Sequence, residues 1–218
     1  MQKFLSFLLF SLSFLAIAGC TVVENLLPSG TPLESGTILY ADDFSKPGGW
    51  GTMGRNGGSI QFEYEGLNIK VDTPNFLFWT VNGKNYQDVM VDVDAVLLSG
   101  PTNDNFGVIC RFKNNENFYG MVISHDGYYG IFKNIEGNIQ PLLQPEGMRY
   151  SEIIRQGGIV NHIQATCRGK SLSLTVNGEK LASVDDSDLA SGKFGLIAGA
   201  YDQPGVDVLF DNLLVVQP

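Results

Sequence analysis

The chain alternates apolar and polar residues in many short runs, and this alternation restricts it to a fold built from β-strands. The runs are divided by Gly, Asn and Asp, and no window keeps a long helical period. Only 17% of the residues are charged, whereas glycine occurs 26 times, which is typical of strands joined by tight turns. The pattern predicts an all-β fold, an antiparallel two-sheet sandwich. The expected strands cover 38–44, 59–64, 67–72, 76–81, 87–98, 105–113, 117–124, 128–134, 138–143, 160–168, 171–176, 180–184, 193–200 and 206–216.

The N-terminal segment has the features of an export signal. Lys3 precedes an apolar run over 4–17, and the sequence Ile17-Ala18-Gly19-Cys20 resembles the lipobox of bacterial lipoproteins. The run is shorter than the roughly 20 residues that a membrane-spanning helix needs. We therefore expect residues 1–19 to be a signal peptide and Cys20 to become the lipidated N-terminus. The alternatives are an ordinary signal peptide with a chance cysteine and a short membrane anchor.

This reading divides the chain into three parts and assigns it a location. Residues 20–36 contain two prolines with Ser and Gly, so we expect a tether between the lipid and the domain. The sandwich would then cover residues 37–218. The protein would lie at the bacterial cell envelope, on the exported side, and touch the membrane through its lipid anchor only.

The charge of the chain excludes some classes of partner. The formal net charge is −9 at pH 7. A surface of this sign repels the phosphates of nucleic acid and anionic lipid headgroups. We therefore expect no nucleic acid among the partners.

Two cysteines remain after Cys20, and an exported protein favours pairing them. Cys110 and Cys167 both lie at positions that point to the apolar face of their expected strands. A disulfide between them would stabilise the fold by roughly 4 kcal/mol in the chain-entropy description. Two buried free thiols are the alternative.

Turn residues give a register for the middle of the chain. Asp126-Gly127 suits a two-residue hairpin turn, and Asn114-Asn115 suits another one hairpin earlier. Pairing outward from these turns places Cys110 opposite Tyr119. A hairpin between 87–98 and 105–113 would pair Leu98 with Asn105. In this register, the side chains expected to point into the core are those of Val89, Val91, Val93, Ala95, Leu97, Phe106, Val108, Cys110, Met121, Ile123, Tyr128, Phe132, Ile163, Ala165 and Cys167.

The residues that alternate with these point to the opposite face and are polar or aromatic, and we expect a ligand surface on that face. Carboxylates and a guanidinium would bind sugar hydroxyls, and aromatic rings would stack on the apolar faces of sugars. Gly107 and Gly120 would leave room between these side chains. The alternative is a solvated sheet face with cross-strand ion pairs. The expected ligand-binding residues are Asp92, Asp94, Arg111, Phe118, Tyr129 and Lys133.

Several short motifs follow one another along the chain: Asp42-Asp43-Phe44-Ser45, Gly107-Val108-Ile109-Cys110-Arg111-Phe112, Cys167-Arg168-Gly169, Gly192-Lys193-Phe194-Gly195-Leu196 and Phe210-Asp211-Asn212-Leu213. Their order resembles the concanavalin A-like and laminin-G-like jelly rolls over residues 37–218. It is most similar to the domains grouped with the 3-keto-disaccharide hydrolases of bacterial envelope proteins. The resemblance implies two curved sheets, with glycan or protein ligands on the concave side or on rim loops.

The resemblance also implies a possible structural calcium ion, because superfamily members hold one near the chain ends. Asp43 and Asp211 are the residues that match such a site. Calcium takes six to eight oxygen ligands, and two carboxylates supply fewer. Structural hydrogen bonding by these aspartates is the alternative. No other cofactor is expected.

Catalytic motifs are scarce in the sequence. The acidic run of the jelly-roll glucanases is absent, since only Asp92-Val93-Asp94 comes near it. Neither His125 nor His162 has a metal ligand at zinc spacing, and both are expected on the surface.

These observations favour a non-catalytic module that binds a glycan or an envelope component. The alternative is a 3-keto-glycoside hydrolase or a related glycoside-processing enzyme that uses Asp92 or Asp94. A structural or adhesive envelope protein is the third possibility.

Overall fold

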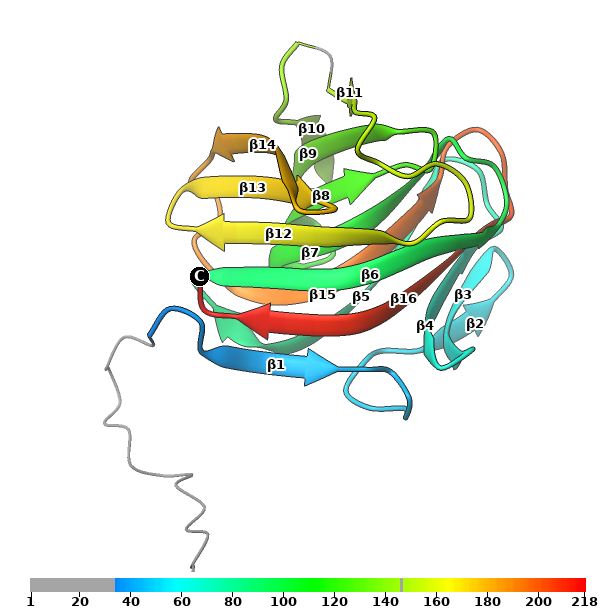
Figure 1. The fold of residues 1–218 in the computed structure, drawn as a ribbon, viewed down its shortest axis with the longest axis horizontal. Helices are drawn as coiled ribbons and strands as arrows, with labels where there is room; N and C mark the ends of the chain where they lie inside the picture. The colour runs from blue at the N-terminus through cyan, green and yellow to red at the C-terminus, as the bar shows by residue number, and fades with distance from the viewer. Residues whose placement is uncertain (1–33, 146) are drawn as a thin grey trace, which may run out of the picture. The chain divides into compact units, whose positions relative to one another are not determined.

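The fold is an all-β sandwich of two antiparallel sheets. The computed structural model describes residues 34–145 and 147–218, and these contain strands and no helix. Cys20, the expected signal peptide and most of the expected tether lie outside the described residues. In Figure 1 the long strands of one sheet, called sheet A, lie in front of those of the other, called sheet B.

Sheet A has nine strands in the order β14-β13-β12-β6-β16-β4-β3-β2, with β1 also paired to β16. Sheet B has seven strands in the order β10-β9-β8-β7-β15-β5, with β11 also paired to β9. The strands of sheet A are β1 (Ile38–Asp42), β2 (Met53–Arg55), β3 (Gly58–Glu63), β4 (Gly66–Val71), β6 (Val89–Ser99), β12 (Asn161–Arg168), β13 (Ser171–Val176), β14 (Glu179–Asp185) and β16 (Val206–Val216). The strands of sheet B are β5 (Phe76–Tyr86), β7 (Asp104–Asn114), β8 (Asn117–Ile123), β9 (Tyr128–Ile135), β10 (Asn138–Pro141), β11 (Arg149–Tyr150) and β15 (Gly192–Ala200).

One continuous apolar core fills the space between the sheets. The alternation in β6 and β12 turns alternate residues inward, as the sequence predicted. Cys110 on β7 and Cys167 on β12 are fully buried and form a disulfide that joins the two sheets. The predicted disulfide is thus confirmed. The buried residues from β6 and β12 are Val89, Val91, Val93, Ala95, Leu97, Ile163, Ala165 and Cys167.

The expected hairpin between 87–98 and 105–113 does not exist. β6 pairs with β12 and β16, whereas β7 pairs with β8 and β15 in the other sheet. The segment between β6 and β7 contains Gly100, at a φ of 112°, and Pro101, and it crosses from sheet A to sheet B. Alternation fixes which face of a strand is apolar, but it does not say which strand lies beside it. Asp92 and Arg111 therefore belong to different sheets.

The turn between β8 and β9 has three loop residues, not two. The N–H of Ser124 donates to the carbonyl of Tyr128 at 2.8 Å, which leaves His125, Asp126 and Gly127 in the loop. Gly127 has a φ of 99°, as three-residue hairpin loops commonly require of their last residue. Because of the extra loop residue, every side chain of β9 points to the opposite side of the sheet from the side that the sequence predicted.

The chain ends meet in sheet A. β1 pairs with the last strand, β16, and the N–H of Gly36 donates to the carbonyl of Gln217 at 2.8 Å. None of the described residues belongs to a helix with the length and apolarity that a membrane span requires.

Replacing both Cys110 and Cys167 with alanine is expected to lower the free energy of unfolding by roughly 4 kcal/mol, because the disulfide joins positions 57 residues apart. Urea denaturation of the oxidised parent, the reduced parent and the double variant measures the effect. The last two should unfold at similar urea concentrations. Equal stability of all three proteins would contradict the prediction.

Candidate functional site

Arg111 is a buried structural residue and not part of a ligand surface. It has a φ of 52°, and the β7–β8 register shifts between Cys110 and Asn114. This bulge turns the guanidinium into the protein, where the Arg111 side chain is 2% exposed. Its Nε and two terminal nitrogens donate to the carbonyls of Gln87, Leu189 and Gly169 at 3.1, 2.8 and 2.5 Å.

These contacts tie three loops to β7. Burial lowers the pKa of Arg111 below its ordinary value, although Tyr119 and Asp88 act in the opposite direction. The guanidinium nevertheless makes charge-assisted hydrogen bonds with all three carbonyls. The prediction that Arg111 binds a ligand on an exposed face is therefore wrong.

Tyr129 and Lys133 also point the opposite way from the prediction, because the loop before β9 is one residue longer. Tyr129 is 7% exposed and lies in the core, with its hydroxyl donating to the carbonyl of Leu181. Lys133 pairs with Asp186 at 2.8 Å and with Asp188 at 2.6 Å. Tyr129 thus links β9 to β14 of the other sheet, and Lys133 links β9 to the loop between β14 and β15, so neither belongs to an outer binding face.

The Lys133 pair belongs to a small network around Tyr119, whose hydroxyl donates to Asp186. Burial and this hydrogen bond raise the pKa of Tyr119 to about 12. Burial alone would raise the pKa of Asp186, but hydrogen bonds from Lys133 and Tyr119 outweigh it and hold that pKa below its ordinary value. The carboxylate of Asp186 is therefore a stabilising charge.

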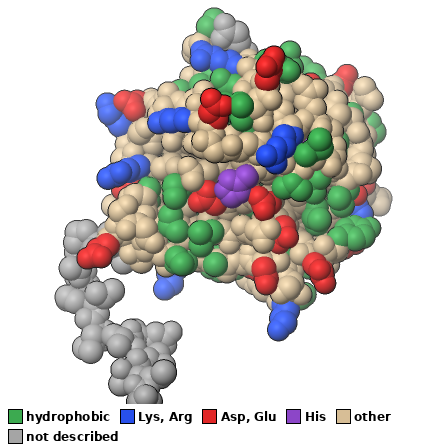
Figure 2. Space-filling model, in the orientation of Figure 1, with side chains coloured by type: hydrophobic (Ala, Val, Ile, Leu, Met, Phe, Trp, Pro, Cys, Tyr) green, Lys and Arg blue, Asp and Glu red, His purple; other side chains and the backbone are tan. Residues whose placement is uncertain are grey.

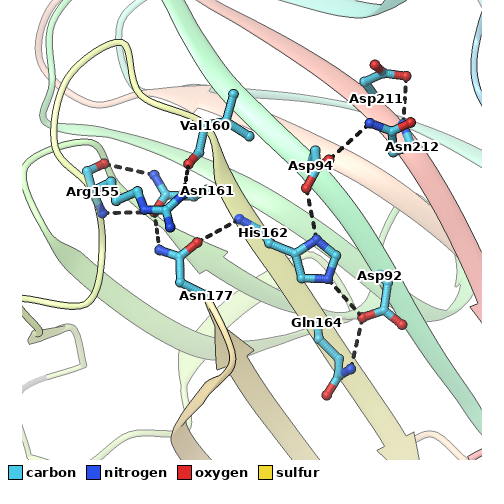
Figure 3. Close-up of polar contacts among 10 residues, drawn as sticks. All are labelled: Asp92, Asp94, Arg155, Val160, Asn161, His162, Gln164, Asn177, Asp211 and Asn212. Atoms are coloured by element: carbon cyan, nitrogen blue, oxygen red, sulfur yellow. Dashed lines mark hydrogen bonds and ion pairs between the residues drawn. The ribbon is translucent and has the colours of Figure 1, made fainter.

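Asp92 and Asp94 lie together on the outer face of sheet A, and His162 lies between them (Figure 3). The ring nitrogen Nδ1 of His162 is 2.8 Å from Asp94, and Nε2 is 3.4 Å from Asp92. Gln164 donates to Asp92 at 2.9 Å, and Asn212 donates to Asp94 at 3.0 Å. We call these five residues the histidine cluster.

The sequence placed Asp92 and Asp94 on the correct face but missed their partners. His162 was correctly expected on the surface, and its side chain is 49% exposed. Its proximity to the two aspartates depends on the pairing of β6 with β12, which joins segments far apart in the chain. Figure 2 shows a histidine flanked by acidic side chains on the face that sheet A presents. The cluster places an imidazole between two carboxylates, and these are the kinds of side chain that general acid–base catalysts use.

Asp43 and Asp211 both hydrogen-bond to residues near them in the chain. Asp43 accepts from the backbone N–H and the hydroxyl of Ser45, and these bonds lower its pKa. Asp211 accepts from the N–H of Asn212 at 2.7 Å. Within the part of the chain that the structure describes, no three His, Cys, Asp or Glu side chains gather as a metal-binding group. A calcium ion at Asp43 and Asp211 stays a prediction.

The outer face of sheet B is apolar, and Phe118 lies fully buried within it. Phe118 packs against Trp79, Phe112 and Phe132, with ring centroids 5.4, 6.0 and 6.1 Å away. The sequence placed Phe118 on the outer face correctly. Its ring is covered by its neighbours, so it cannot itself touch a ligand without their movement.

Two adjoining cavities follow this face, and together we call them the sheet-B groove. The first, called the apolar cavity, has a volume of about 320 Å³. The second, called the polar cavity, has a volume of about 400 Å³. The apolar cavity is lined by Leu77, Asn105, Val122, Gly130, Ile131, Phe132, Ile139, Pro141, Gly147 and Met148. The polar cavity is lined by Asn103, Asp104, Asn105, Ser124, Asp126, Tyr128, Met148 and Tyr201.

Asn105 lines both cavities, and its side chain is half-buried. No hydrogen bond of its carboxamide occurs within the described chain, although this group has two donors and an acceptor. Tyr128 and Tyr201 stand at the polar end with 42% and 62% of their surface exposed. The groove thus offers rings and a free amide to a ligand.

His125 is buried beneath the polar cavity, which contradicts its expected surface position. Its Nδ1 is 2.7 Å from Asp104, and its ring stacks on Phe106 at a centroid distance of 4.0 Å. Burial raises the pKa of Asp104, while the hydrogen bonds from His125 act in the opposite direction. The three-residue loop after β8 folds this histidine inward, next to Asp104 at the start of β7.

Known structures share this fold at low sequence identity. The carbohydrate-binding module CBM66 from Bacillus subtilis has a TM-score of 0.64 and 16% identity, over 78% of this chain and 96% of that chain. A protein of unknown function with a galectin-like fold, also from Bacillus subtilis, has a TM-score of 0.62 and 13% identity, over 84% and 97%. The GH43 protein BlXynB from Bacillus licheniformis has a TM-score of 0.60 and 13% identity, over 82% of this chain but only 39% of that chain.

These similarities show the fold, a jelly-roll, galectin-like sandwich. No protein-family model and no curated protein matches the chain. The finer resemblance to 3-keto-disaccharide hydrolases therefore stays a prediction.

Asp186→Asn is expected to lower the free energy of unfolding by about 2 kcal/mol at pH 7, because it removes a largely buried charge bonded to Lys133 and Tyr119. The pKa of Asp186 is depressed in the folded state, so its contribution is complete above the unfolded pKa of about 3.9. The difference from the parent should shrink as the pH falls below about 4 and vanish below the folded pKa.

Urea denaturation between pH 3 and pH 7 measures this difference. Asp185→Asn is the matched control, because Asp185 is 57% exposed and its partner among the described residues is the exposed Lys170. It should change the stability by less than about 1 kcal/mol at every pH. If the difference in unfolding free energy between the parent and Asp186→Asn grows as the pH falls, the Asp186 carboxylate is not a stabilising charge.

Proposed function

We propose that this protein binds glycans through the sheet-B groove, at the bacterial cell envelope, where a lipid on Cys20 would hold it. The anchoring part of the proposal is supported by the lipobox-like sequence Ile17-Ala18-Gly19-Cys20. The binding part is supported by the fold shared with the carbohydrate-binding module CBM66. No catalytic step is needed for this function.

The observation that carries the proposal is the combination of groups around Asn105. Sugar rings have apolar C–H faces and polar edges, so their binding sites combine aromatic rings with a few hydrogen-bonding groups. The polar cavity supplies two exposed tyrosines beside Asn103, Asp126 and the unpartnered carboxamide of Asn105. Both cavity volumes lie within the range of small-molecule sites, about 300–1,000 Å³.

A glycan array followed by calorimetry with the purified protein tests this function. Tyr201→Ala and Asn105→Ala should each weaken the binding of the retained glycan by about tenfold, through lost stacking and lost hydrogen bonds. Tyr64→Ala is the matched control, because Tyr64 is 70% exposed and lies in the β3–β4 turn of sheet A. It should leave the affinity unchanged.

An array without any retained glycan would contradict the proposal and favour a structural or adhesive role. Loss of binding in Tyr64→Ala, but not in Tyr201→Ala, would move the site to sheet A.

A second candidate function rests on the histidine cluster. A glycoside-processing enzyme of the 3-keto type needs a base that removes a proton beside a ketone. His162 lies within 3.4 Å of Asp92 and 2.8 Å of Asp94 on an exposed face, so a base and its orienting carboxylates are present together. This arrangement supports a catalytic function that uses an imidazole base and does not require a metal ion.

Turnover of a 3-keto glycoside tests this candidate. His162→Ala and Asp92→Asn should each reduce the rate by about 10²–10⁴-fold, which is typical for the loss of a general base. Asp185→Asn is the control and should retain full activity. Absence of turnover in the parent protein, or turnover that survives both changes, would eliminate the histidine cluster as a catalytic site.

A further inference from the structure

The two cavities of the sheet-B groove differ in chemistry, and a ligand that fills both must combine two kinds of group. Of the described residues that line the apolar cavity, Asn105 alone has a polar side chain. A sugar hydroxyl placed deeper in this cavity would lose its water and find no side-chain partner beyond Asn105. The group that enters the apolar cavity must therefore be apolar beyond its first few atoms.

The polar cavity selects against an acidic ligand. The residue Asp126 lines it, and the carboxylate of Asp202 accepts a hydrogen bond from Asn103 at its edge at 2.7 Å, whereas the Asp104 side chain is fully buried against His125. None of the described residues that line it is Lys or Arg. A sugar with a carboxylate would meet charge of its own sign there, so the polar cavity disfavours an acidic sugar.

Asn105 lies where the cavities meet, and its carboxamide is half-buried without a hydrogen bond in the described chain. A carboxamide offers both a donor and an acceptor, and a second amide complements both. An N-acyl group on a sugar consists of an amide followed directly by an apolar chain. Such a group would place its amide at Asn105 and its acyl chain in the apolar cavity.

We infer that the sheet-B groove takes a non-acidic N-acylated amino sugar, with the acyl chain in the apolar cavity and the sugar ring in the polar cavity. This inference rests on the proposed glycan-binding function and names the ligand class of the same groove. The volume of about 320 Å³ exceeds what an acetyl methyl group fills, so longer acyl chains also fit.

Calorimetric titration of the full chain with two matched sugar series tests the inference. Each series, one built on glucosamine and one on galactosamine, contains the parent neutral sugar, the free amine, and the N-acetyl and N-butanoyl derivatives, all as methyl glycosides. In at least one series the N-acetyl sugar should bind about tenfold more tightly than the neutral parent, and the N-butanoyl sugar at least as tightly.

Two isoleucine variants separate the apolar cavity from general effects. Ile139→Ser changes a residue that lines the apolar cavity on the edge strand β10 and is 50% exposed. Ile159→Ser is its matched control, because Ile159 is 55% exposed and is not among the lining residues of either cavity. The preference for acylated sugars should fall several-fold in Ile139→Ser and stay unchanged in Ile159→Ser.

The outcomes distinguish this inference from the function on which it rests. Equal binding of neutral and acylated sugars would overturn the acyl preference and leave glycan binding intact. Binding of other glycans on an array, with no binding of either series, would do the same. Failure to bind any glycan would remove both proposals together.

Discussion

The packing of two apolar sheet faces against each other is the interaction on which the rest of this structure depends. The inner residues of β6, β12, β7 and β8 form one core, and the disulfide between Cys110 and Cys167 crosses it. Because both inner faces are committed to this contact, every exposed functional group must come from an outer face or a loop. The division into inner and outer faces therefore decides which side chains a ligand can reach.

The two outer faces have different characters, and this difference separates the candidate functions. Sheet A presents the histidine cluster, in which carboxylates, an imidazole and amides bind one another on an open polar face. Sheet B presents aromatic and aliphatic side chains with a groove between them. Acid–base catalysis would take place on the outer face of sheet A. Stacking of sugars on aromatic rings and burial of apolar groups would take place on the outer face of sheet B.

Several charged groups that could serve a ligand instead stabilise the sandwich. Arg111 binds three carbonyls from separate loops, and Lys133 binds Asp186 and Asp188 near the β14 end of sheet A. A buried charge needs such partners, since an unpaired one would be costly to remove from water. The Asn105 carboxamide differs from these groups because it has no hydrogen bond in the described chain, and this leaves it available to a ligand.

The sequence by itself determined the fold class, the inward faces of most strands and the Cys110–Cys167 pair, because alternation with period two is a local property. It also placed Asp92, Asp94 and Phe118 on outer faces. The tertiary structure alone decided that β6 and β7 lie in different sheets, which separated Asp92 from Arg111 and brought His162 to it. It likewise decided the three-residue loop before β9 and the bulge at Arg111, which turned Tyr129, Lys133 and Arg111 inward. Strand neighbours and single-residue shifts depend on contacts between distant segments, and no local pattern of residues records them.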